Sequence, residues 1–171
     1  MRNTLGIFVV KIRKYKVYAD ACILIAWITG EERPSHEMDG VRDCFDKVIR
    51  GEVLLVALRN TIFEEVHLNT PESAEKFRQL MMRRGIELPS LDLRIERLAE
   101  ELRYHYSANG RKGLQLNDSY HLAAAIHYKV DAFYTFDNGG KGGVSLLSLN
   151  GNVAGHPLLI CKPPFSQVRL F

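Results

Sequence analysis

Short apolar runs of strand length alternate with segments of helical periodicity along the chain, and this alternation limits the fold more than any other feature. Strands are expected at residues 16–19, 53–58, 86–88, 132–136, 144–149 and 158–161. Helices are expected between them, at 21–28, 41–49, 62–66, 73–81, 91–106 and 117–128. Such alternation produces βαβ units, in which helices cover both faces of a parallel sheet. The sequence therefore predicts an α/β fold with three α/β/α layers and a mostly parallel central sheet.

The length and composition fit one globular domain. The chain has 171 residues, 46% of them hydrophobic and 25% charged, which excludes a disordered or low-complexity protein. We find no internal repeat, so residues 1–171 are interpreted as a single domain. Lysine and arginine (23) slightly outnumber aspartate and glutamate (20), giving a net charge of +3. This balance permits a polyanionic partner without requiring one.

The three cysteines and the lack of long apolar segments indicate the compartment. No CxxC pair or disulfide framework is present, and Cys22 and Cys44 lie in apolar helical patterns where a thiol behaves as a small buried hydrophobe. No run approaches the roughly 18 apolar residues of a membrane span. The apolar run at 5–10 precedes its basic residues, opposite to a signal peptide. We expect a cytoplasmic protein without membrane association.

Three aspartates occupy the ends of strands or the starts of helices. Asp20 follows the first strand, Asp137 follows the strand at 132–136, and Asp118 lies just after Asn117, the expected cap of a helix. Each has an ordinary structural explanation alone, as an N-cap, a turn residue or a first-turn acid. In a parallel sheet, however, these positions converge on one edge, where functional crevices form.

A glutamate pair adds to this group of acids. Glu64 and Glu65 follow the strand at 53–58, and their ordinary explanation is a solvated helical face. Converging carboxylates repel each other, and their pKa values rise unless a cation neutralises them. Oxygen ligands suit Mg²⁺ or Mn²⁺, and the matching chemistry is hydrolysis of a phosphodiester bond.

Four segments give the chain a resemblance to PIN-domain proteins, and among them to the VapC toxin ribonucleases. They lie at residues 17–25, 61–66, 117–125 (NDSYHLAAA) and 132–137 (AFYTFD), and the last two are the most specific. The resemblance covers about residues 17–149. Residues 1–16 and 150–171 extend beyond the usual limits of the family, as N-terminal and C-terminal extensions of one PIN-like domain.

The resemblance implies an endoribonuclease that depends on Mg²⁺ or Mn²⁺ and uses an acidic quartet. Carried over to this chain, the quartet is Asp20, one glutamate of the pair, Asp118 and Asp137, and the three aspartates would hold the metal. If the segment is aligned on Thr61, with the acid three residues later, the site glutamate is Glu64. If it is aligned on the apolar residue that usually follows the acid, here Val66, the site glutamate is Glu65. We favour Glu65, which leaves the neighbouring apolar side chains free to pack inward.

The resemblance also extends to Thr135. This residue is similar to the small hydroxyl residue that often precedes the last acid, and it could orient water or a carboxylate or simply favour a strand.

The resemblance also implies partners. A toxin would act on RNA, form a homodimer and pair with a small antitoxin whose C-terminal segment fills the acidic groove. The alternatives are a stand-alone RNA-processing nuclease and a non-catalytic PIN-like binding module.

Other polar residues have weaker claims to a function. His121 lies three residues after Asp118, so the pair could ligate a metal, but packing or a helix hydrogen bond is the favoured explanation. The glycine-rich stretch at 139–143 lacks the spacing of a phosphate-binding loop and is expected to be a plain loop. Arg111 and Lys112 could contact RNA phosphates or only water.

Overall fold

The central element of the fold is a parallel β-sheet. The computed structural model describes residues 13–33, 36–59, 70–107, 113–139 and 143–165. Within these ranges five strands form one sheet in the order β3-β2-β1-β4-β5, and every pairing is parallel. The strands are β1 (Tyr15–Ala19), β2 (Val53–Val56), β3 (Ile86–Glu87), β4 (Ala132–Tyr134) and β5 (Ile160–Cys161).

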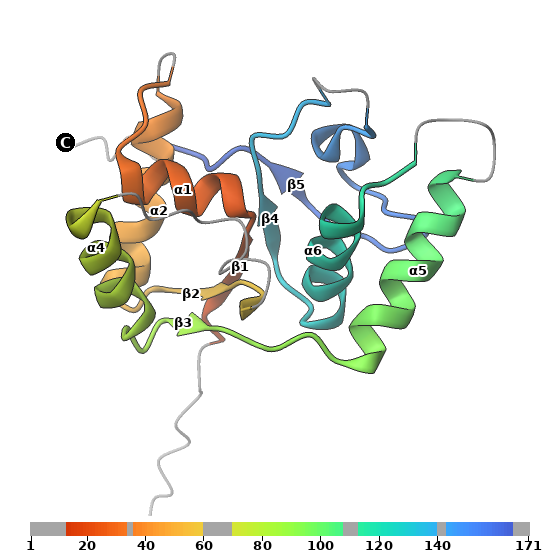
Figure 1. Ribbon diagram of the computed structural model, residues 1–171, viewed down its shortest axis with the longest axis horizontal. Coiled ribbons are helices and arrows are strands. Elements are labelled where there is room, and N and C mark those ends of the chain that lie inside the picture. Colours follow the sequence, from red (N-terminus) through yellow and green to blue (C-terminus); the bar gives the residue numbers. More distant parts are fainter. Residues whose placement is uncertain (1–12, 34–35, 60–69, 108–112, 140–142, 166–171) are drawn as a thin grey trace, which may run out of the picture.

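Helices cover both faces of this sheet, as Figure 1 shows. One layer contains α1 (Ala21–Thr29), α2 (Glu37–Ile49) and α4 (Pro71–Met81). The other contains α5 (Leu93–Ser107), α6 (Leu116–His127) and the 3₁₀ helix η1 (Leu146–Leu149). The predicted three-layer α/β/α architecture is confirmed.

Alternate residues of the central strands enter two separate cores. In β1, Val17 and Ala19 belong to the core shared with α1, α2 and α4, whereas Tyr18 belongs to the core shared with α5 and α6. All three are at most 1% exposed. Because both faces are covered, these strands read as continuous apolar runs instead of alternating with polar residues.

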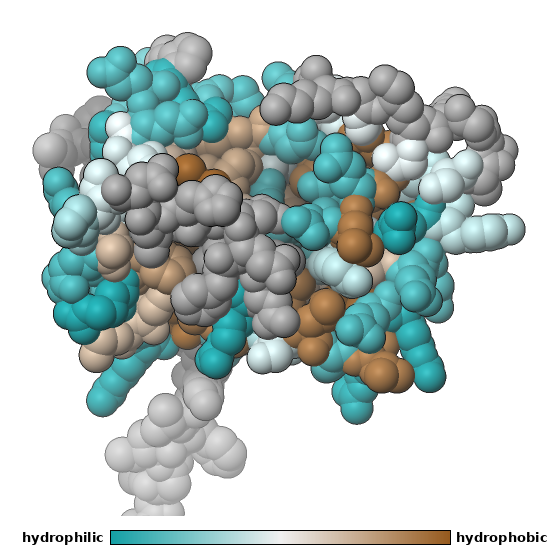
Figure 2. All heavy atoms as spheres, viewed as in Figure 1, coloured by the Kyte–Doolittle hydropathy of each residue, from teal (hydrophilic) through white to brown (hydrophobic). Residues whose placement is uncertain are grey.

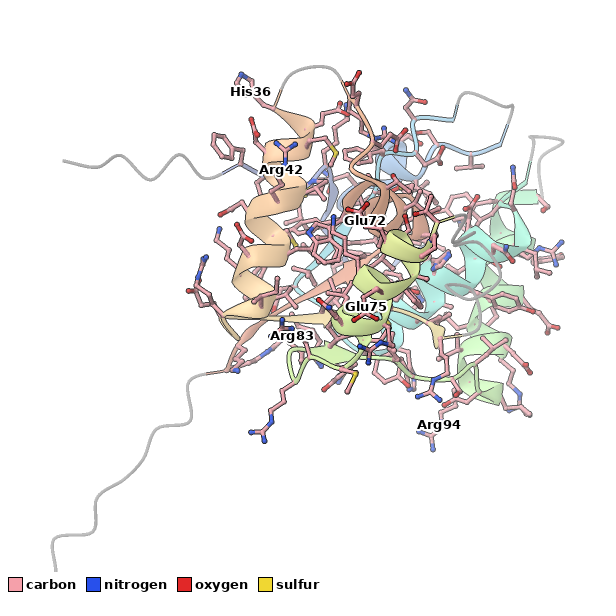
Figure 3. All side chains as sticks on the ribbon, turned by 60° about the vertical axis from the view of Figure 1, so that its left-hand side comes forward. His36, Arg42, Glu72, Glu75, Arg83 and Arg94 are labelled. Carbon is pink, nitrogen blue, oxygen red and sulfur yellow. The ribbon has the colours of Figure 1, made fainter. Side chains whose placement is uncertain are left out.

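The outer faces of the helices are polar, and their ends are defined by local signals. Glu72 and Glu75 lie on the outward side of α4, and Arg42 lies on that of α2 (Figure 3). Thr70 caps α4 by accepting a hydrogen bond from the Ser73 N–H, so this helix begins two residues earlier than expected.

The described residues that are visible in Figure 2 form no continuous hydrophobic face. Hydrophobic residues lie there among hydrophilic ones over α5 and α6. Leu93 (62% exposed) and Met82 (72% exposed) are single exposed side chains of a kind that folded proteins commonly carry. No helix in the described ranges is both long enough and apolar enough to span a membrane.

The apolar run at 144–149 is not a strand, which corrects the sequence prediction. It contains η1, whose first residue donates its N–H to the Asp137 carboxylate while the Ser145 hydroxyl accepts from the Ser148 N–H. These side-chain acceptors satisfy the backbone locally, so the segment does not need a neighbouring strand. The strand expected near 158–161 is confirmed as β5, which places part of the C-terminal extension in the sheet.

The strand order creates a switch point between β1 and β4. The chain leaves β1 for α1 on one face of the sheet and enters β4 from α6 on the other face. The connections therefore diverge at this pair of strands, and a crevice opens beyond their carboxyl ends. The N-termini of α1 and α6 both adjoin the crevice, and only Asp20 separates β1 from α1.

Candidate active site

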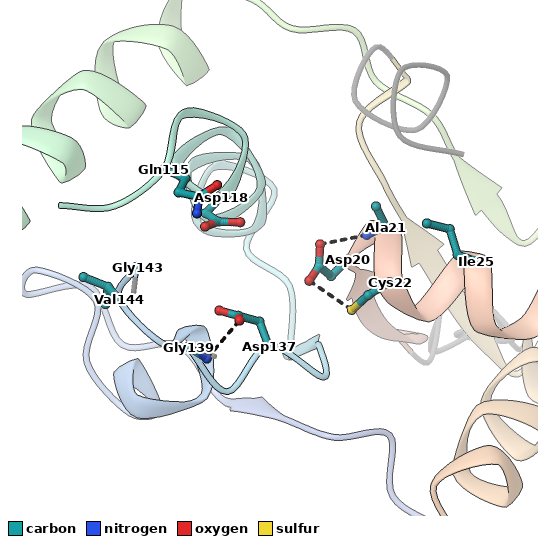
Figure 4. Close-up of a pocket in the computed structure, with 10 residues that line it drawn as sticks. All are labelled: Asp20, Ala21, Cys22, Ile25, Gln115, Asp118, Asp137, Gly139, Gly143 and Val144. Atoms are coloured by element: carbon teal, nitrogen blue, oxygen red, sulfur yellow. Dashed lines mark hydrogen bonds between the residues drawn. The ribbon is translucent and has the colours of Figure 1, made fainter. Parts of the chain in front are cut away.

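A pocket of about 400 Å³ occupies the crevice at the switch point. Figure 4 shows three aspartates from separate segments facing it: Asp20 at the end of β1, Asp118 on α6 and Asp137 after β4. The structure therefore brings together the three aspartates that the sequence singled out. The other lining residues are Ala21, Cys22, Ile25, Gln115, Gly139, Gly143 and Val144.

Asp20 is held tightly by its neighbours. It is the N-cap of α1, and its Oδ1 accepts a hydrogen bond from the Ala21 N–H at 2.7 Å. Its Oδ2 accepts from the Thr135 hydroxyl at 2.6 Å and from the Cys22 thiol at 3.2 Å. The side chain is only 10% exposed, so these donors compensate for much of the water that the carboxylate has lost.

Asp118 reaches the pocket from the other layer. It lies in the first turn of α6 and is half-buried. The helix begins at Leu116 with Gln115 as its N-cap, so the expectation that Asn117 is the cap is wrong by two residues. The unpaired N–H groups and the dipole of a helix N-terminus favour a negative charge at this position.

Asp137 organises the loop on the third side of the pocket. Its Oδ1 accepts from the Gly139 N–H at 3.0 Å, and its Oδ2 accepts from the Leu146 N–H at 2.9 Å. The turn expected from its sequence context is present. Gly139 has φ +81°, and an added Cβ would lie 2.9 Å from the Ser145 Cβ, so this turn requires glycine.

Thr135 connects two of the acids. Its hydroxyl donates to Asp20 Oδ2 and accepts the Asp137 N–H at 3.0 Å. The side chain is fully buried, with an exposed fraction of 0%. A single hydroxyl thus fixes the Asp20 carboxylate relative to the backbone of Asp137.

We expect Thr135→Val to destabilise the protein, although it preserves the side-chain shape. It leaves the Asp137 N–H and one Asp20 oxygen without this partner, which costs about 1–3 kcal/mol for a buried group. The free energy of unfolding from urea titration measures the effect. Thr135→Ser, which keeps the hydroxyl, is the control and should lose less. Equal stability of the valine variant and the wild type would contradict this role.

Cys22 is a pocket residue that sequence reasoning missed. The expectation of a buried hydrophobe needs correction, because Cys22 is only partly buried and its sulphur also accepts the Phe136 N–H at 3.3 Å. Burial raises the pKa of the Cys22 thiol well above its usual range, and the Asp20 carboxylate raises it further. The thiol therefore stays protonated and donates to Asp20. The signal available in the sequence was its position two residues after Asp20; Cys44, by contrast, is buried as expected.

The remaining candidates divide into two groups. His121 is buried, with Nε2 3.8 Å from Asp20 Oδ1. The glutamate pair Glu64 and Glu65, the basic residues Arg111 and Lys112, and residues 140–142 of the glycine-rich stretch lie outside the described residues. The choice between the two glutamates therefore stays a prediction.

The donor chemistry of the pocket suits a hard divalent cation. Among the residues that the structure describes, no three His, Cys, Asp or Glu side chains converge closely enough to form a ready-made cage. Mg²⁺ does not need such a cage, since it keeps several waters and is usually held by one or two carboxylates together with substrate phosphate. Asp20 and Asp118, on opposite sides of the pocket, fit this mode of binding.

The sequence match to a family model identifies the class of protein. The model of the PIN domain matches residues 17–140, a range that includes all three aspartates of the pocket. The chain belongs to the PIN domain family. PIN domains are generally nucleases, and PIN nucleases generally use divalent metals. No curated protein matches the chain significantly.

Two solved structures share this fold. The crystal structure of VapBC2 from Rickettsia felis bound to a DNA fragment from their promoter superposes with a TM-score of 0.61, at 11% identity, covering 85% of this chain and 97% of that chain. The crystal structure of FitAcB from Neisseria gonorrhoeae superposes with a TM-score of 0.50, at 17% identity, covering 72% of this chain and 88% of that chain.

Proposed function

We propose that this chain is a metal-dependent endoribonuclease that hydrolyses RNA phosphodiester bonds at the pocket between β1 and β4. The observation that carries the proposal is the convergence of Asp20, Asp118 and Asp137 on one pocket from three segments of the chain. Membership of the PIN domain family supports nuclease chemistry there.

The aspartates have distinct roles in this proposal. Asp20 and Asp118 are the main metal ligands, while Asp137 and Glu65 (or Glu64) complete the site and position the attacking water. A bound Mg²⁺ or Mn²⁺ would neutralise these charges, activate water and stabilise the attacking and leaving oxygens. The hydrogen bonds to Asp20 and Asp137 hold their carboxylates in place before substrate arrives.

We further propose that the nuclease is the toxin of a type II toxin–antitoxin pair acting in the cytoplasm. The named VapBC2 and FitAcB complexes, which share the fold, support this assignment. A small antitoxin would place its C-terminal segment in the acidic pocket, and the toxin would form a homodimer. A neighbouring gene for a short DNA-binding protein favours the toxin role over a stand-alone RNA-processing enzyme.

Cleavage of a mixed RNA pool by the purified protein tests the nuclease proposal. We expect cleavage with Mn²⁺ or Mg²⁺ and none with EDTA, because the carboxylates repel the substrate phosphates when no cation is present. Mn²⁺ binding is measured separately by electron paramagnetic resonance. Neither cleavage nor Mn²⁺ binding by the folded protein would overturn the proposal in favour of a non-catalytic binding module. Metal binding without cleavage would be followed by a test on structured RNAs.

A further inference from the structure

A buried pair of side chains, His121 and Tyr18, lies directly behind Asp20 and has no role in the site as described so far. His121 is on α6, one turn after Asp118, and is 1% exposed. Its Nε2 is 3.8 Å from Asp20 Oδ1. This distance exceeds that of a hydrogen bond, so the interaction across it is electrostatic.

Tyr18 fixes the other side of the imidazole. Its hydroxyl lies 2.8 Å from His121 Nδ1, and the ring is fully buried. It stacks on Phe133 with a centroid distance of 5.2 Å and an interplanar angle of 2°, and meets the His121 ring edge-on at 5.7 Å. Both rings are therefore locked by packing, which leaves the proton positions as the main variable of the pair.

The hydrogen bonds around Tyr18 favour one tautomer of His121. The Leu58 N–H can only donate, and it donates to the Tyr18 oxygen at 3.1 Å. The Tyr18 hydroxyl can accept this bond and still donate its own proton to Nδ1, and a neutral imidazole whose Nδ1 accepts carries its own proton on Nε2.

The Asp20 end of the ring favours the same tautomer. A protonated Nε2 presents the positive end of its N–H dipole to the Asp20 carboxylate, whereas a bare Nε2 would present a lone pair to a negative charge. The contact of Nδ1 with Tyr18 and the contact of Nε2 with Asp20 are independent, and both favour a proton on Nε2.

We propose that Tyr18 holds His121 as the Nε2-protonated tautomer, and that His121 is a positioning residue for the Asp20 carboxylate. Its role in hydrolysis rests on the proposed nuclease function. Thr135 and Cys22 hold Asp20 Oδ2 from one side, and the His121 N–H faces Oδ1 from the other. Together with the Ala21 N–H, which donates to Oδ1, these groups hold the carboxylate at both oxygens, as outer partners commonly fix metal-ligating side chains.

The tautomer can be measured without any nuclease activity. Long-range ¹H–¹⁵N NMR spectra of the full chain at neutral pH distinguish the two ring nitrogens, and the His121→Gln variant assigns the signals by their loss. We expect an acceptor-type Nδ1 and a protonated Nε2. Tyr18→Phe removes the hydroxyl and should move the spectrum toward a mixture of tautomers. A protonated Nδ1 in the wild type would overturn the proposal.

Two substitutions test the positioning role. Glutamine places its amide near the position of Nε2 and can present an N–H to Asp20, whereas asparagine reaches only the position of Nδ1. We expect His121→Asn to lower kcat by about 10- to 100-fold, with little change in KM, as loss of an outer partner at a metal site commonly does. His121→Gln should keep most of the activity.

The melting temperatures of the two variants separate positioning from packing. Loss of activity that follows loss of stability in both variants, or an equal kcat in both, would overturn the positioning role. Absence of RNA cleavage by the wild type is a different outcome, because it contradicts the proposed nuclease function. In that case the NMR spectra still decide the arrangement of Tyr18, His121 and Asp20.

Discussion

Replacing Asp118 by asparagine is expected to reduce RNA cleavage by more than about 100-fold, since even outer-shell substitutions at metal sites cost about 10- to 100-fold. The variant keeps the size of the side chain but removes a charge from the pocket. Asp118 is half-buried in the first turn of α6, and the substitution leaves the N-cap residue Gln115 unchanged. We therefore expect a melting temperature close to that of the wild type, measured alongside initial rates of RNA cleavage.

The same chemical change on a remote surface provides the matched control. Asp39 lies on α2, its side chain is 40% exposed and pairs with Arg42 at 3.1 Å, and it is not among the residues that line the pocket. Asp39→Asn should leave cleavage unchanged. Full activity in the Asp118 variant would remove this carboxylate from the site. Equal loss in both variants would point to a general effect of charge on RNA binding.

Replacing Phe133 by alanine is expected to cost about 3–5 kcal/mol of folding free energy, the usual range for a buried phenylalanine. Phe133 is on β4, is fully buried and stacks on Tyr18 in the core that α5 and α6 share with the sheet. Since typical stabilities are about 5–15 kcal/mol, this single change would use a large part of the total. Chemical denaturation monitored by circular dichroism measures it.

An exposed aromatic residue on α5, the helix layer that covers Phe133, is the control for this experiment. Tyr104 on α5 is 80% exposed, and Tyr104→Ala should change stability by less than about 0.5 kcal/mol. If the Phe133 variant were no less stable than the Tyr104 variant, the packing described for this core would be wrong.

The sequence predicted the layers well because the signals for them are local. The apolar run at 53–58 and the amphipathic pattern at 41–49 correspond to β2 and α2, although β2 ends at Val56. Prediction failed at 144–149, where an equally apolar run forms η1. The difference comes from the hydrogen bond between the Leu146 N–H and Asp137, a contact between positions nine residues apart that hydrophobicity does not encode.

The convergence of the three aspartates on one pocket could be predicted, because each follows a strand or opens a helix. A parallel sheet brings such positions to the same edge. Their supporting residues could not be predicted in the same way. The bond between Tyr18 and His121 joins positions 103 residues apart, and that between Thr135 and Asp20 joins positions 115 residues apart. Such partners are chosen by packing of the finished core and leave no short-range pattern in the sequence.

The parallel pairing of β1 with β4 has a consequence for folding during synthesis of the chain. Asp20 and Thr135 are distant along the chain, and the strands that carry them pair only after both have been synthesised. During most of translation the pocket aspartates therefore lie on segments that are not yet packed together. Pairings over such distances form late, since a long loop must close first. The pocket therefore cannot be complete in any shorter product of translation, and it first forms in a chain that has grown beyond Val144, which also lines it.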